Sequence, residues 1–114
     1  MPYRNLATLE SWLTEFRDLG YEVAGSLKVI VQDGDAGADT GLVGVHLAYA
    51  STAVYVQPVP GGIGRWEATM EPRDDAVVLD AAGLLRLSGE LAMLSTLCTF
   101  LQTKSQVCID TDAV

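Results

Sequence analysis

The chain has 114 residues, of which 49% are hydrophobic and 19% are charged, and its 7 Lys and Arg residues face 15 Asp and Glu residues for a formal net charge of −8. This length suits one domain and this composition supports a packed core, which excludes a disordered chain and two full-size domains. Because nucleic acids and anionic membranes are bound mainly by clustered cations, neither is an expected partner.

The first predicted element is an amphipathic helix over residues 6–19. Its apolar side chains recur at spacings of three and four, and charged residues take the other face. Asn5 can cap the first turn with its side-chain oxygen, and Gly20 supplies the left-handed conformation that ends many helices. No signal-peptide pattern precedes this helix, so a cytoplasmic location is expected.

Alternating apolar residues after the first helix predict an antiparallel meander of four or five strands. The strands are expected near residues 27–32, 43–49, 53–59 and 65–71, with 76–79 as a short fifth strand. Turn-forming residues separate them, and prolines end the third strand because they cannot donate to a sheet ladder.

The fourth strand has the clearest alternation. Trp66, Ala68 and Met70 are predicted on a dry face, and Glu67 and Glu71 lie with other polar residues on a wet one. The two glutamates could share a proton or bind a substrate, but an ordinary solvated strand face is the favoured interpretation.

A long helix capped by Asp80 is predicted over residues 81–104, and residues 105–114 are expected to form a tail or a short extra strand. Apolar residues at spacings of three and four run through this helix, and a second apolar set widens the face. The main series is Leu84, Leu87, Leu91, Leu94, Cys98 and Leu101.

The apolar circumference of this helix requires a cover. Leaving half of it in water would forfeit on the order of 10 kcal/mol. The sheet and the first helix could cover it, or a second subunit could complete the burial in a twofold dimer. The residues proposed for the interaction or dimer surface are Leu84, Leu87, Leu91, Leu94 and Leu101.

The acidic loop over residues 33–41 is the nearest approach to a metal site. Asp33, Asp35 and Asp39 are spaced like calcium ligands. The register nevertheless lacks the glycine and the final glutamate of an EF-hand, so a solvated hairpin loop is favoured and no metal is expected.

Catalytic signatures are weak. His46, the single histidine, is predicted on the polar side of its strand, and no serine stands in a nucleophile elbow. Cys98 and Cys108 are expected to be reduced thiols, the first buried on the helix and the second in the tail. No cofactor is expected, because the glycine-rich segment 60–64 precedes a strand rather than a helix.

These features predict one α+β domain over residues 1–114, with an N-terminal helix, the meander, and a long C-terminal helix packed on the sheet. The leading hypothesis is a non-catalytic interaction module, an adaptor or chaperone-like homodimer with a protein partner. In its general features it resembles secretion chaperones, without a shared motif. The alternative is a small-molecule binding domain or enzyme whose pocket is lined by Tyr49, Tyr55, Trp66 and Met70.

Overall fold

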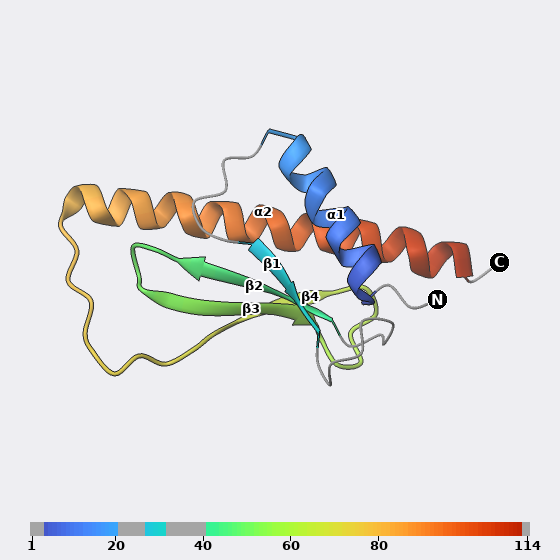
Figure 1. Cartoon of the computed structure of the whole chain (residues 1–114), viewed down its shortest axis with the longest axis horizontal. Helices are drawn as coiled ribbons and strands as arrows, with labels where there is room; N and C mark the ends of the chain where they lie inside the picture. The colour runs from blue at the N-terminus through green and yellow to red at the C-terminus, as the bar shows by residue number, and fades with distance from the viewer. Residues whose placement is uncertain (1–3, 21–26, 32–40, 113–114) are drawn as a thin grey trace.

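Two helices lie on one face of an antiparallel sheet in the computed structural model, which describes residues 4–20, 27–31 and 41–112 (Figure 1). The described chain confirms the predicted α+β arrangement of helix, sheet and long helix. Its elements are α1 (Leu6–Asp18), β1 (Leu27–Ile30), β2 (Leu42–Leu47), β3 (Thr52–Pro58), β4 (Trp66–Met70) and α2 (Ala81–Asp112).

The first helix, α1, begins and ends at the predicted signals. The Asn5 side chain accepts a hydrogen bond from the Thr8 N–H at 2.8 Å, and Gly20 has a φ of +90°, which L side chains rarely adopt. The helix places one apolar face in the core, made of Leu9, Trp12, Leu13 and Phe16.

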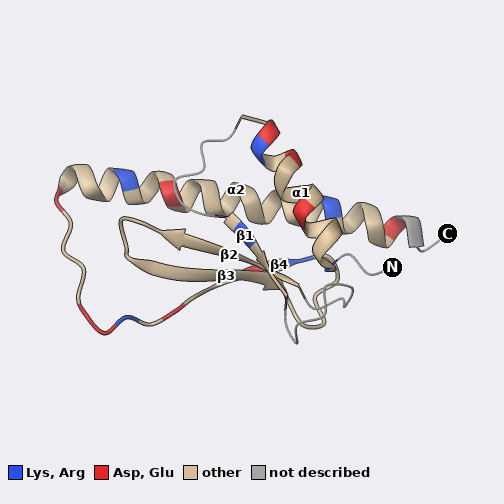
Figure 2. Ribbon diagram, viewed as in Figure 1, with Lys and Arg blue, Asp and Glu red and all other residues tan. Residues whose placement is uncertain are grey.

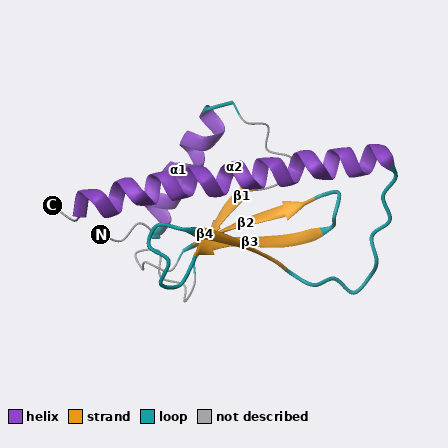
Figure 3. Cartoon of the chain, turned by 180° about the vertical axis from the view of Figure 1, so that it is seen from behind, coloured by secondary structure: helices purple, strands orange, loops and turns teal. Residues whose placement is uncertain are grey.

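The four strands pair in sequence order, and every pair is antiparallel. In the register, Val43 lies opposite Val56, and Val56 lies opposite Ala68. Residues directly opposite each other share a face, so these side chains point toward the helices. Figure 3 shows α1 and α2 from behind, on that same side of the sheet. No helix covers the other face within the described chain.

The predicted fifth strand over residues 76–79 is wrong. Residues 71–80 form an extended connection, here called the strap, which leaves β4 and returns to the start of α2 away from the sheet (Figure 1). Arg73 ties the strap to the β2–β3 turn, because its guanidinium donates to the Ala50 carbonyl oxygen and, at 2.7 Å, to the Thr52 hydroxyl. This tie holds the strap at the turn instead of along the edge of β4.

The second helix, α2, starts where the sequence predicts but extends further. Asp80 accepts a hydrogen bond from the Gly83 N–H at 2.8 Å, as expected for a cap. The expected tail or extra strand after residue 104 is wrong, because α2 continues to Asp112. Buried Ser105 and half-buried Cys108 extend the core-facing stripe of the helix past its polar residues.

Only the first residue of the predicted dry face of β4 is buried. Trp66 is 5% exposed, whereas Met70 is 53% exposed and Ala68 is exposed as well. The reason is that β4 is an edge strand and α2 reaches only its start. There the Trp66 indole N–H donates to the Ser105 hydroxyl at 2.7 Å, and the Trp66 backbone N–H donates to the Gln102 side-chain oxygen at 3.2 Å.

A buried carboxylate joins α2 to the turn between β2 and β3. Glu90 is 1% exposed, and its two oxygens accept the backbone N–H groups of Ala48 and Tyr49 at 2.8 and 2.9 Å. Hydrogen bonds from backbone donors compensate the loss of water around a buried carboxylate. Glu90 therefore fixes the position of the helix along the sheet.

Replacing Glu90 should destabilise the fold strongly. We expect Glu90→Leu to lower the free energy of unfolding by about 2–3 kcal/mol, because two donors in the turn lose their acceptor. Urea unfolding followed by circular dichroism measures the change. Glu10→Leu, on the exposed face of α1, is the control and should change it by less than about 0.5 kcal/mol. Equal effects would show that the Glu90 bonds contribute nothing to stability.

Candidate interaction surface

The first turns of α2 extend beyond the β2–β3 turn, so the sheet does not cover them (Figure 1). Leu84 is 56% exposed and Leu85 is 74% exposed, although both belong to the apolar pattern of the helix. Leu91, one turn beyond Leu87, is still 38% exposed. Leu84, Leu87 and Leu91 recur at spacings of three and four and so share one side of the helix, whereas Leu85 projects from another side.

A hollow lies between these turns and the strap. It has a volume of about 490 Å³, and Ala50 and Arg73 lie at the turn side. We call it the apolar groove; its apolar lining residues are Val77, Val78, Leu79, Leu84 and Leu87. The groove is an open trough and not an enclosed cavity, which suits a chain segment better than a small molecule.

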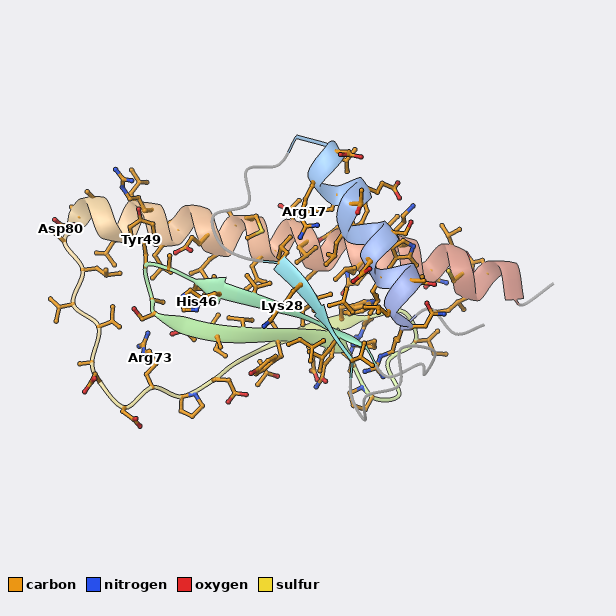
Figure 4. All side chains as sticks on the ribbon, in the orientation of Figure 1. Arg17, Lys28, His46, Tyr49, Arg73 and Asp80 are labelled. Carbon is orange, nitrogen blue, oxygen red and sulfur yellow. The ribbon has the colours of Figure 1, made fainter. Side chains whose placement is uncertain are left out.

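Two arginines contact the hairpin turn beside the groove, where Figure 4 labels Arg73 and Tyr49. Arg73 connects the turn to the strap, as described above. Arg86 of α2 donates to the Tyr49 hydroxyl at 3.1 Å, and its guanidinium carbon lies 5.8 Å from the centre of the Tyr49 ring. Contacts of this kind restrain both walls of the groove relative to the sheet.

Charge is unevenly distributed around this surface (Figure 2). From Leu91 to Thr103, α2 carries no charged residue. The strap and the helix start carry the exposed acids Asp74, Asp75 and Asp80. The groove is therefore apolar inside, and its borders carry both signs of charge, because Arg73 and Arg86 lie close to these acids.

The residues predicted for the interaction surface divide into two groups. Leu84, Leu87 and Leu91 lie at the surface or are half-buried. Leu94 and Leu101 are 4% and 0% exposed and belong to the core, so including them in the surface was wrong. The division falls where α2 passes over the sheet and α1, which bury the later turns.

The predicted small-molecule pocket is also wrong. Trp66 and Met70 lie on the helix-covered face of β4, whereas Tyr55 lies on the open face of β3 and Tyr49 lies in the turn. Alternate residues of a strand point to opposite faces, so the strand positions alone separate Tyr55 from Trp66. These four side chains line no common cavity in the described chain.

The remaining polar candidates do not converge either. His46 is exposed on the open face of the sheet, as predicted, and Glu67 and Glu71 are exposed on that face as well. Of the acidic loop over residues 33–41, all but Gly41 lie outside the described residues. Among those that are described, no group of three His, Cys, Asp or Glu residues could hold a metal ion.

No family model, curated protein or solved structure matches the chain. Function is therefore inferred from its own residues.

The second helix is also long and apolar enough to cross a membrane. An 18-residue window within Ala81–Asp110 has a mean hydropathy of 1.3, a value that core helices of soluble proteins reach as well. Only 28% of the apolar window is buried inside the chain. Much of α2 consequently presents apolar or uncharged side chains to solvent, and another protein or a membrane could cover them.

Both cysteines lie in α2 and are half-buried. Cys98 packs against the core, and this burial raises the pKa of its thiol. Cys108 lies in the helix and not in a tail, and it too packs against the core. A raised pKa keeps the Cys98 thiol protonated and poorly nucleophilic at neutral pH.

Cys98 should react slowly with alkylating reagents in the folded protein. In a Cys108→Ser variant at pH 8, we expect iodoacetamide to modify Cys98 about tenfold more slowly than in urea, since both burial and the raised pKa lower the reactive thiolate fraction. Mass spectrometry over time measures the rate. Equal rates in folded and unfolded protein would show that the thiol is neither buried nor shifted.

Proposed function

We propose that this chain is a non-catalytic interaction module, an adaptor or chaperone-like protein that acts as a homodimer in the cytoplasm. Its partner is a polypeptide segment held in the apolar groove. The observation that carries the proposal is the groove itself: Leu84 and Val78, 56% and 91% exposed, line a trough of about 490 Å³.

The energetics favour an apolar occupant. Fully burying one Leu or Val side chain stabilises a complex by roughly 1.5–3 kcal/mol before the entropic cost of association. Several such side chains lie together here. Hydrogen bonds from the β2–β3 turn to Glu90 of α2, and from Arg73 of the strap to the turn, hold the elements that carry them in place. A preformed surface costs little ordering when the partner binds.

The strap favours an extended segment over a helix. Between Pro72 and Leu79, no backbone hydrogen bond joins the strap to any other described residue. Its N–H and C=O groups are available to a second extended chain, as in recognition by strand addition. Val77 and Leu79 are half-buried and the intervening Val78 is exposed, the alternation of a strand with one covered side.

A double substitution in the groove should abolish partner binding. We expect Leu84→Asp with Val78→Asp to reduce capture of the partner from a native lysate at least tenfold, because two carboxylates would have to be desolvated in an apolar contact. Both side chains are exposed, so the melting temperature should stay within a few degrees of the wild type.

Thr103→Asp is the matched control, since it adds a carboxylate to an exposed position of the same helix outside the groove. It should capture the partner as the wild type does. Wild-type protein that recovers no stoichiometric polypeptide would contradict the proposal. Binding to lipid vesicles that disappears in the double variant would instead assign the surface to a membrane.

A further inference from the structure

The outer edge of β4 is free of any described strand. The Glu71 N–H donates to the Ala53 carbonyl oxygen, and the Val59 N–H donates to the Arg65 carbonyl oxygen. In an antiparallel ladder these bonds involve alternate residues. Arg65, Glu67, Thr69 and Glu71 therefore direct their backbone groups to β3, and the backbone groups of Trp66, Ala68 and Met70 point outward.

This edge is short and carries charges at Arg65, Glu67 and Glu71, but these side chains lie on the open face of the sheet. Within the described chain, no proline, bulge or covering segment of the kind that commonly prevents strand pairing stands on β4. On β4, the Trp66 N–H is satisfied by Gln102, but Ala68 and Met70 present outward backbone groups together with exposed apolar side chains. The edge is ready to accept one more antiparallel strand.

We propose that the occupant is the β4 strand of a second copy of this chain. A twofold axis perpendicular to the sheet and passing between the two Ala68 residues would pair all 5 residues of each β4. Trp66 then lies opposite the partner subunit's Met70, and Glu67 lies opposite the partner subunit's Thr69. The result is a continuous eight-stranded sheet with all helices on one face.

The charged residues on and beside β4 favour an axis at Ala68 over an axis at either neighbouring residue. Arg65 falls opposite the partner's Glu71, and the twofold axis makes this pair twice. Both side chains are exposed and neither is paired with another described residue. Moving the axis to Thr69 would place Glu67 opposite the partner's Glu71, and moving it to Glu67 would place two Glu67 carboxylates opposite each other. Like charges opposed across strands destabilise pairing.

The covering helix is compatible with this pairing. In one subunit, α1 packs on β1 while α2 packs on β4, so α2 is the helix nearer to the free edge. Its exposed positions Ala92, Ser95 and Thr99 are small and uncharged. Two such helices can lie side by side above the paired strands without opposing charges, and they would cover Met70.

This contact rests on the proposed function, because it supplies the interface of the proposed homodimer. The apolar groove lies outside the paired strands. A charge swap tests the register. Sedimentation equilibrium should show dimers for the wild type. Arg65→Glu alone, or Glu71→Arg alone, should raise the dimer dissociation constant about tenfold to hundredfold. The double variant, which exchanges the two charges, should restore the wild-type dissociation constant. A monomeric wild type, or single variants as dimeric as the wild type, would overturn it.

A second pair of variants tests the axis independently. Ala68→Lys would place two ammonium groups together at the twofold axis and should give monomers, whereas the same substitution at exposed Ala7 of α1 should leave the dimer intact. Circular dichroism should show unchanged folding in both. A dimeric Ala68→Lys variant would refute the strand pairing. A wild-type protein that is monomeric but still captures its partner would refute the dimer contact and leave the proposed binding function of the groove standing.

Discussion

The structure depends on covering the apolar circumference of α2. One side of this helix supplies Leu97 and Leu101 to the core, where the sheet and α1 exclude water from both. Glu90 marks the boundary, because its carboxylate is bound by the β2–β3 turn and the sheet ends there. The turns before Glu90 lie beyond the sheet, and the turns after it form the centre of the domain.

The apolar groove and the free edge of β4 both follow from this arrangement. The groove exists because α2 begins beyond the end of the sheet and the strap must span that distance to reach it. The free edge of β4 exists because α2 reaches the strand only at Trp66 and leaves Met70 uncovered. Both places expose apolar side chains to solvent, which another polypeptide could cover.

Local patterns predicted most of the architecture. The periods of α1 and the strands, the caps at Asn5 and Asp80, and the start of α2 all follow from residue spacing and side-chain chemistry. The extent of burial could not be predicted in the same way. Leu84 and Leu101 occupy equivalent positions of one apolar series, yet only tertiary placement separates the exposed residue from the buried one.

The other features that the sequence did not predict also have physical causes. An edge strand and a central strand can share one alternating pattern, so the exposure of Met70 depended on sheet order and helix reach. Glu90 interrupts an apolar run in sequence and gives no sign that two backbone donors will bind it. Lys104 and its polar neighbours resemble the end of a helix, but Ser105 and Cys108 continue the stripe that faces the core.

The order of elements along the chain has a consequence for synthesis. A ribosome releases the four strands well before it releases Leu97, Leu101 and Ser105, which close the core above them. Until those residues emerge, α1 is the one described helix that can cover the apolar face of the sheet. Exposed apolar surface of this kind favours aggregation, and the late docking of α2 removes it.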